Sequence, residues 1–281
     1  MKTLLQINSV VNFGSTGRIA EEIGQIAIAA GWESYIAYGR HARTSQSKLI
    51  KIGSDWDIKW HGLQTHLFDR HGLASTNATK KLVEKIKEIK PDIIHLHNLH
   101  GYYLNIEILF HYLATANIPV VWTFHDCWPM TGHCAYFTFV ECDKWKTQCF
   151  SCPQKKGYPS SYFLDRSKQN YTQKRKLFTS VNDITIVPVS NWLADIVKQS
   201  YLKDYPIRVI NNGIDVNVFS PQSGDGIRLK YGLADKFILL GVATAWGRRK
   251  GLHDFIELSK ILKDDETIVL VGVKENHIKL L

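Results

Sequence analysis

Apolar residues along the chain fall into short runs that alternate with stretches in which they recur every three or four positions. Runs rich in Val and Ile, typical of buried strands, cover residues 3–8, 34–38, 93–97, 119–124, 184–189, 236–243 and 267–271. Helical periodicity covers residues 18–30, 80–90, 104–115 and 252–262, and another helix begins near Trp192. Strands that alternate with helices predict an α/β fold with a parallel, doubly wound sheet.

The alternation of strands and helices begins a second time after Asn212-Gly213-Ile214-Asp215. We therefore predict two Rossmann-like domains, the first over residues 1–205 and the second over residues 206–281. The pattern of the second domain contains two strands and one full helix, whereas a sheet of this kind usually has about five or six strands. We expect the second domain to be truncated.

Composition suits a globular protein, because 44% of the 281 residues are hydrophobic and no apolar run reaches the roughly 18 residues that span a bilayer. Gln6 and Asn8 interrupt the first apolar run, which argues against a secretory signal. We expect a cytoplasmic protein whose cysteines are reduced.

The net charge of +9 is concentrated in residues 144–176, where nine basic side chains accompany one acid, Asp165. Such a stretch is either a solvated face or a contact for an anionic partner, such as a phosphate-bearing substrate, an acidic membrane surface or nucleic acid. The aromatic residues within it fit a peripheral contact with the inner face of an anionic membrane: Trp145, Phe150, Tyr158, Tyr162 and Phe163.

Polar residues follow several predicted strands of the first domain. A glycine loop, Gly14-Ser15-Thr16-Gly17, precedes the first helix, whose N-terminus offers free N–H groups to a phosphate; a plain tight turn is the alternative. His95 and His97 alternate onto one face of their strand, followed by Asn98, and His125 and Asp126 follow the next strand. The carboxyl ends of parallel strands share one edge, where ligands bind. We expect His125 to contact a ligand hydroxyl, with Asp126 either fixing its tautomer or binding elsewhere.

A basic turn, Arg248-Arg249-Lys250, lies between a strand and a helix of the second domain. Arginine offers a planar fork and lysine a movable point charge, so the turn suits a diphosphate.

Four cysteines lie within nineteen residues, at Cys134, Cys142, Cys149 and Cys152. Their spacing suits a structural zinc site with four thiolate ligands, although a redox or disulfide pair and unligated thiols are alternatives. Cys127 lies outside this cluster, and we expect it to stay free.

Several of these segments together resemble the family 4 retaining glycosyltransferases. Val209-Ile210-Asn211-Asn212-Gly213-Ile214-Asp215, with Phe219 and Pro221, resembles the family motif N-G-[IV]-D…F-x-P. The segments 91–97, 123–126 and Val189-Ser190 resemble three further strand-end motifs. The cysteine insertion is similar to that of a bacterial subgroup that builds capsule, exopolysaccharide or lipopolysaccharide.

The resemblance implies two Rossmann-like domains (the GT-B fold), with the acceptor on the first and a nucleotide-diphosphate sugar held mainly by the second. It implies that Gly14 and Gly17 lie beside the donor phosphates, that His125 contacts the transferred sugar, and that Arg248 or Arg249, with Lys250, holds the diphosphate. His95, His97, Asn98, Ser190 and Asn212 would then line the cleft. No catalytic divalent metal is expected, because the cations neutralise the leaving charge. A pair of glutamates seven residues apart would follow residue 271 in the family, beyond the end of this sequence.

The sequence thus favours an enzyme that transfers a hexose or related sugar to a glycan or lipid-linked acceptor in cell-surface polysaccharide biosynthesis. One alternative is a non-catalytic remnant or half-protein that binds the acceptor or a partner chain. A weaker alternative is a zinc-containing nucleic-acid binder. Since the sequence contains no recognised nucleic-acid module, we expect no nucleic-acid partner.

Overall fold

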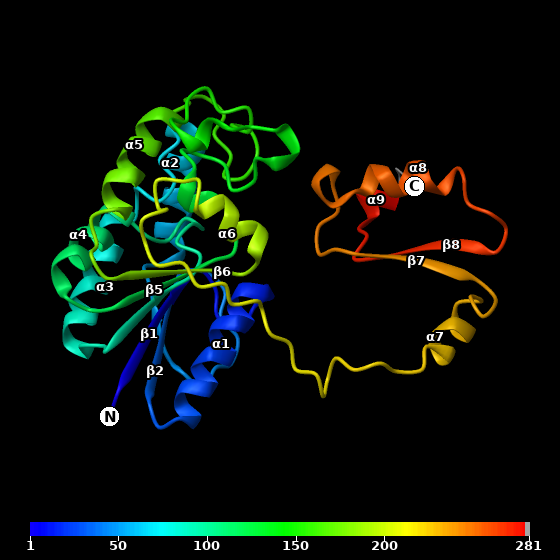
Figure 1. Ribbon diagram of the computed structural model, residues 1–281, viewed down its shortest axis with the longest axis horizontal. Coiled ribbons are helices and arrows are strands. Elements are labelled where there is room, and N and C mark those ends of the chain that lie inside the picture. Colours follow the sequence, from blue (N-terminus) through cyan, green and yellow to red (C-terminus); the bar gives the residue numbers. More distant parts are fainter. Residues whose placement is uncertain (279–281) are drawn as a thin grey trace. The chain divides into compact units, whose positions relative to one another are not determined.

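A computed structural model describes residues 1–278, which form two compact units (Figure 1). The first unit spans Met1–Gly213, and the second begins at Ile214. The predicted α/β fold with a parallel sheet is confirmed by the strand order of the first unit.

The described part of the first unit contains a six-stranded sheet in the order β3-β2-β1-β4-β5-β6. The central strand pairs in parallel with both neighbours, so that Leu5 lies opposite Tyr35 on one side and Ile94 on the other. The strands are β1 (Thr3–Asn8), β2 (Glu33–Tyr38), β3 (Lys48–Lys51), β4 (Ile93–Leu96), β5 (Val120–Phe124) and β6 (Ile184–Pro188).

Helices cover both faces of this sheet. In Figure 1, α1 and α6 lie on one side of the sheet, and α3, α4 and α5 lie on the other. The helices are α1 (Gly14–Ala29), α2 (Asp55–Phe68), α3 (Thr76–Ile89), α4 (Ile106–Ala116), α5 (Ser167–Phe178) and α6 (Asn191–Val197). Because helices pack on both faces, all six residues of β1 are buried.

Aromatic side chains join the sheet to α4 and α5. Phe110 packs against Trp122 of β5 and Phe178 of α5, with ring centroids 5.4 and 4.5 Å apart. The Asn105 side chain accepts a hydrogen bond from the backbone of Ile108 and thereby fixes the start of α4. The core therefore lies directly beneath the carboxyl ends of β4 and β5.

Three elements of the first unit are not predicted by the sequence pattern: β3, α2 and α5. Two positions that α2 buries completely, His61 and Thr65, are polar, and α5 buries Asn170 and Lys174 as well as apolar side chains. Periodicity of apolar residues is a weak signal for a helix that buries polar side chains.

Residues 207–210 extend along β6 and therefore belong to the first unit. The Arg208 backbone N–H donates to the Ile186 carbonyl, and that of Ile210 donates to the Pro188 carbonyl, at 2.9 and 3.2 Å.

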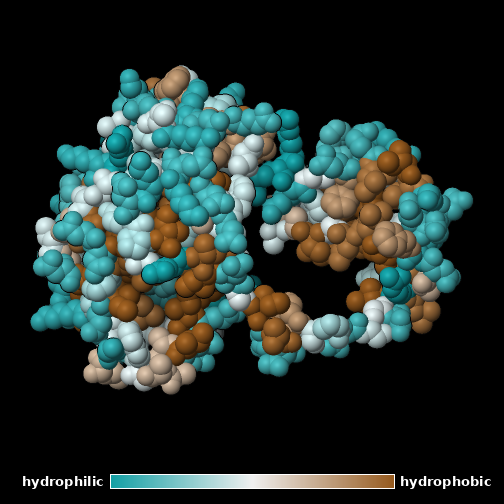
Figure 2. Space-filling view, in the orientation of Figure 1, coloured by the Kyte–Doolittle hydropathy of each residue, from teal (hydrophilic) through white to brown (hydrophobic). Residues whose placement is uncertain are grey.

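The second unit contains a two-stranded parallel sheet over its described residues. Its elements are α7 (Asp225–Lys230), β7 (Phe237–Val242), the 3-10 turn η4 (Arg248–Lys250), α8 (Leu252–Ser259), β8 (Glu266–Val271) and α9 (Glu275–Ile278). Trp246 and Leu252 are buried, but Phe237, Leu240 and Val242 are exposed. Figure 2 shows apolar side chains gathered on the surface of this unit.

Over residues 1–278, no helix has the length and apolar character required to cross a membrane.

Candidate active site

A pocket of about 470 Å³ opens at the carboxyl edge of the first unit's sheet. Ser9 and Val10 follow β1, and most of the other residues come from the ends of β2, β4, β5 and β6 and from the start of α1. Tyr136 and Asn212 lie outside these positions. The remaining lining residues are Phe13, Gly14, Ser15, Thr16, Arg40, His41, Asn98, His100, His125, Asp126, Tyr136, Val189 and Asn212.

His125 lies directly after β5 and lines this pocket. Its Nε2 lies 3.2 Å from Nδ1 of His97, and the two rings stack with centroids 5.5 Å apart. Burial lowers the pKa of His125 to about 4, so its imidazole is neutral at pH 7. A neutral imidazole can donate one hydrogen bond and accept another, which suits recognition of a hydroxyl group.

Asp126 makes its side-chain hydrogen bonds elsewhere and not with His125. Its Oδ2 lies 2.7 Å from Nε2 of His100, and its Oδ1 accepts a hydrogen bond from the Trp128 backbone at 2.9 Å. Burial alone would raise the pKa of Asp126, but the charge of His100 and these hydrogen bonds hold the pKa below its ordinary value. Asp126 therefore binds His100 and the Trp128 backbone, and it does not fix the tautomer of His125.

His100 is a pocket residue that the sequence analysis missed. Its ring joins Asp126 on one nitrogen and the Tyr158 hydroxyl on the other, at 2.7 and 2.9 Å. The residue stands four positions beyond β4, at the same sheet edge as His125. The strand-end reasoning that selected His97 and Asn98 would have found it if carried two residues further.

The start of α1 forms one wall of the pocket. Gly14 is the first helical residue, with φ +62°, and Phe13 at the N-cap provides no capping side chain. The N-cap side chain therefore satisfies none of the free N–H groups of this first turn, and Gly14, Ser15 and Thr16 line the pocket. Gly17 is buried instead, and a Cβ there would lie 3.1 Å from the Asn12 nitrogen and from Cγ2 of Val10. Gly17 allows close packing of the turn and does not line the pocket.

Arg40 is a second pocket residue that the sequence analysis missed. It follows β2, and its backbone N–H donates to the Ser9 carbonyl at 3.0 Å. Its Nε is buried without a hydrogen-bond partner among the described residues. A guanidinium that lines a pocket beside a helix N-terminus can bind an anion.

His95 and His97 lie on one face of the sheet, as the alternation of the strand predicts, and their rings stack with centroids 4.2 Å apart. His95 Nε2 lies 2.8 Å from the Thr123 hydroxyl, and His97 Nε2 lies 3.1 Å from Oε1 of Gln6. Burial lowers the pKa of His95 to about 4 and that of His97 well below its ordinary value. His95 stacks on His97, and His97 in turn stacks on His125 and contacts it.

The other predicted cleft residues differ in their positions. Asn98 and Asn212 line the pocket. Ser190 caps α6, where its hydroxyl accepts a hydrogen bond from the Leu193 backbone at 3.2 Å, and it is not among the lining residues.

Arg248, Arg249 and Lys250 form the exposed turn η4 of the second unit. This turn connects the end of β7 to the start of α8, which is the strand-turn-helix context that the sequence predicts. Three adjacent cations before a helix N-terminus can bind a phosphate or a diphosphate.

The predicted zinc site is not supported. Over residues 1–278, no group of three or more His, Cys, Asp and Glu side chains could hold a metal ion. The four cysteines do line one small cavity of about 10 Å³. Burial raises the pKa of the Cys149 thiol to about 11. Cys127 is a free, buried thiol.

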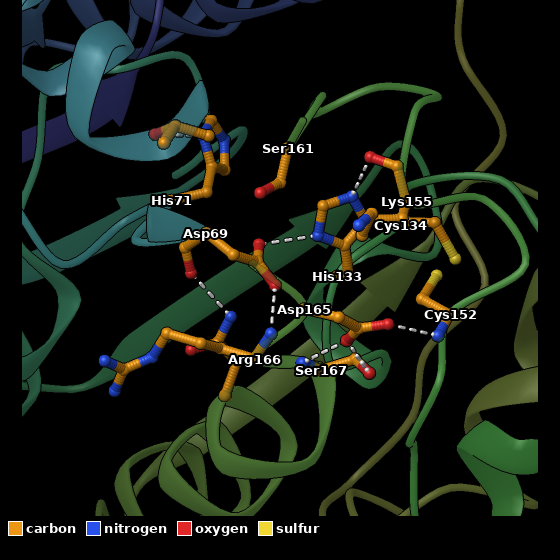
Figure 3. Close-up of polar contacts among 12 residues, drawn as sticks. Asp69, His71, His133, Cys134, Cys152, Lys155, Ser161, Asp165, Arg166 and Ser167 are labelled. Carbon is orange, nitrogen blue, oxygen red and sulfur yellow. Dashed lines mark hydrogen bonds and ion pairs between the residues drawn. The ribbon is translucent and has the colours of Figure 1, made fainter. Parts of the chain in front are cut away.

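Polar contacts hold the cysteine-containing segment to the rest of the first unit (Figure 3). Nδ1 of His133 lies 2.6 Å from Oδ1 of Asp69, whose Oδ2 accepts a hydrogen bond from the Arg166 backbone at 2.8 Å. Asp165 accepts a hydrogen bond from the Cys152 backbone at 2.7 Å. This long segment is therefore ordered by side-chain acceptors in place of regular secondary structure.

The basic stretch 144–176 is less uniformly exposed than its sequence suggests. Lys174 is buried, with Nζ 3.3 Å from the centre of the Trp128 ring and 2.8 Å from the Trp128 carbonyl, and burial lowers its pKa to about 7. Trp145 is also buried and stacks on Phe137. These two residues do not contribute to a charged or aromatic surface.

Comparison with known proteins assigns the chain to a family. The family model described as "Glycosyltransferase Family 4" matches residues 16–218. The match covers more than half of the chain and includes the ends of β2, β4, β5 and β6. The protein belongs to glycosyltransferase family 4.

Individual relatives agree with this assignment. A protein of Escherichia coli K12, described as "Putative colanic acid biosynthesis glycosyl transferase WcaC", is 28% identical over 227 residues, which are 76% of this chain and 55% of the relative. The chain thus spans about half the length of this curated relative.

Two solved structures show the same fold. Sucrose-phosphate synthase from Thermosynechococcus elongatus has a TM-score of 0.61 and 14% identity, covering 98% of this chain and 63% of its own. Anabaena HepE, solved in complex with UDP and glucose, has a TM-score of 0.57 and 14% identity, covering 100% and 64%. The fold is that of the GT-B glycosyltransferases.

Proposed function

We propose that the protein transfers a hexose or related sugar from a nucleotide-diphosphate sugar to a glycan or lipid-linked acceptor during synthesis of a cell-surface polysaccharide. The observation that supports this most is the pocket of the first unit, where His125, the Asp126–His100 pair, Arg40 and the uncapped start of α1 meet. The likeness to a relative described as a colanic acid glycosyl transferase supports the pathway, and the UDP and glucose bound in the Anabaena structure support the donor class.

In this proposal, each group has a separate role. Neutral His125 hydrogen-bonds a hydroxyl of the transferred sugar, while Gly14 and the following N–H groups face the donor phosphates together with Arg40. His100, which also lines the pocket, is held by Asp126 on one ring nitrogen and by the Tyr158 hydroxyl on the other. Arg248 or Arg249, with Lys250, binds the diphosphate on the second unit. These cations stabilise the negative charge that develops on the leaving group.

We further propose that the anomeric configuration of the sugar is retained. The acceptor oxygen forms a bond to the anomeric carbon on the face from which the diphosphate departs. The bond to the diphosphate breaks, and the leaving phosphate oxygen takes the acceptor's proton. This step uses no side-chain nucleophile, which agrees with a pocket in which the one carboxylate, Asp126, is buried and already hydrogen-bonded to His100 and to the Trp128 backbone.

Isothermal titration with a panel of nucleotide-diphosphate sugars tests the proposal. We expect heat of binding with at least one donor and weaker binding in an Arg40→Ala variant. A gel-shift assay with DNA and RNA run in parallel separates the glycosyltransferase from a nucleic-acid binder. Binding of nucleic acid without binding of any nucleotide sugar would overturn the proposal.

A further inference from the structure

Helix α2 has the opposite orientation of polar and apolar residues from that of an ordinary surface helix. Its fully buried side chains are His61 and Thr65, whereas Trp56 and Trp60 are 78% and 60% exposed and Leu63 is 45% exposed. Residues 56, 60 and 63 follow the helical spacing that places them on one face. A surface helix normally turns its apolar stripe inward, so the outward face of α2 is adapted to something other than water.

The polar groups buried beneath α2 are satisfied, so the helix is not misplaced. Nδ1 of His61 lies 2.8 Å from the Ser75 hydroxyl, and its Nε2 accepts a hydrogen bond from the Gly72 backbone at 3.0 Å. Ser54 and Asp57 form a capping box at the N-terminus. These contacts determine which face of α2 points outward.

The apolar surface continues from α2 onto the neighbouring loop. The Tyr162 backbone N–H donates to the His66 carbonyl at 2.8 Å, and the two rings stack with centroids 5.4 Å apart. Phe163, next to Tyr162, is 70% exposed, and Leu164 is also exposed. Figure 1 shows α2 beside this loop. We call Trp56, Trp60, Leu63, Tyr162 and Phe163 the aromatic face.

Cations accompany the aromatic face. Nζ of Lys59 lies 5.0 Å from the centre of the Trp56 ring, on the exposed side of α2. Nζ of Lys155 donates to the Phe163 carbonyl at 3.2 Å, and Lys156 is exposed beside it. Two acids flank Trp56 in the helix, and both have partners: Asp55 forms an ion pair with Lys51, and Asp57 accepts hydrogen bonds from Ser54. The surface therefore combines exposed aromatic rings with a positive charge.

We propose that the aromatic face docks the protein on an anionic lipid bilayer. Indole rings favour the boundary between headgroups and acyl chains, because one edge is apolar and the N–H is polar. Lysines at the rim attract anionic headgroups, and their methylene stems cover apolar surface. A positively charged aromatic surface complements an anionic membrane in both respects. This inference does not depend on the proposed transfer reaction.

Flotation of the 281-residue protein with vesicles tests the docking. Vesicles contain phosphatidylcholine either alone or mixed with phosphatidylglycerol. We expect binding to the anionic vesicles and much weaker binding to the neutral ones. Binding should also decrease with salt, because exposed charges are screened beyond about 8 Å at physiological ionic strength. Equal binding to both vesicle types would contradict the role of the cations.

A matched pair of variants separates insertion from general adsorption. The double substitution Trp56→Ser with Trp60→Ser should reduce partitioning to anionic vesicles about tenfold or more, since it removes two interfacial indoles. Trp192→Ser is the control, because Trp192 is 57% exposed but lies on α6. Quenching of tryptophan fluorescence by brominated lipids should decrease in the double variant and persist in the control. Thermal unfolding checks that both variants fold.

Two outcomes would overturn the proposal. One is a double variant that binds vesicles as the wild type does. The other is sedimentation equilibrium that finds a dimer which the double substitution dissociates, because the aromatic face would then bind a second copy of the chain.

Discussion

His125 and Asp126 are adjacent in the sequence, yet they belong to different hydrogen-bonding groups. His125 contacts His97, whereas Asp126 contacts His100 and the Trp128 backbone. Motif reading treats neighbouring polar residues as partners. The backbone after a strand sets the direction in which each side chain points. Asp126 therefore meets His100, which follows β4, and not its neighbour in the sequence.

We expect His125→Ala to reduce turnover by about 10²-fold or more in a catalytically active form of the enzyme, because it removes a hydrogen bond to the reacting sugar. His125 is only partly buried, so the substitution should leave the thermal unfolding midpoint nearly unchanged. Steady-state kinetics and a thermal melt measure both quantities. Unchanged turnover would remove His125 from the site.

Arg40 provides the second test at the scale of single residues. Since Arg40 lines the pocket beside the start of α1, Arg40→Ala should weaken the binding of UDP about tenfold, which corresponds to about 1.4 kcal/mol. Isothermal titration with UDP measures the change. Arg208→Ala is the control, because Arg208 is exposed and does not line the pocket. An equal loss in both variants would indicate a general charge effect.

At the scale of elements, the buried parallel strands were predictable and the polar helices were not. The runs at 3–8, 93–97 and 119–124 identify strands because both faces of the sheet are covered. Helices α2 and α5 bury polar side chains that find partners distant in the sequence, such as Lys174 with the Trp128 carbonyl. Local periodicity does not contain that information, so these helices could be identified only in the folded chain.

Ser190 has a different role from the one that the sequence suggests. The sequence places it in the cleft, but its hydroxyl caps α6. We expect Ser190→Ala to destabilise the protein by about 1 kcal/mol, the typical cost of losing an N-cap. Ser190→Asp preserves a capping oxygen and should restore most of the stability. Chemical denaturation measures both variants, and equal stability of Ser190→Ala and the wild type would contradict a capping role.

At the scale of the whole molecule, buried histidines make stability dependent on pH. Burial lowers the pKa of His61 to about 3 and that of His95 to about 4, and it lowers those of His71 and His97 as well. A histidine with a lowered pKa binds protons more readily when unfolded. Its contribution to stability is therefore complete above pH ~6.5 and is lost as the pH falls.

We expect the free energy of unfolding to fall between pH 6.5 and pH 4, by about 1.4 kcal/mol per pH unit for each such histidine. The thermal unfolding midpoint should therefore fall steeply over the same range. His133 acts in the opposite direction. Burial alone would lower its pKa, but the hydrogen bond with Asp69 raises it above the ordinary value, so its contribution is complete below pH ~6.5 and is lost at higher pH. Since several histidines outweigh one, a midpoint that stays constant from pH 7 to pH 5 would contradict this burial pattern. Thermal melts across this range provide the measurement.

The central claim is that this protein transfers sugar from a nucleotide-diphosphate donor with retention. The direct measurement is proton NMR of donor consumption by the protein, with the anomeric configuration of the product read from the same spectra. We expect at least one nucleotide-diphosphate sugar to be consumed and the product to have the donor's anomeric configuration. No consumption of any donor, or an inverted product, would contradict the claim.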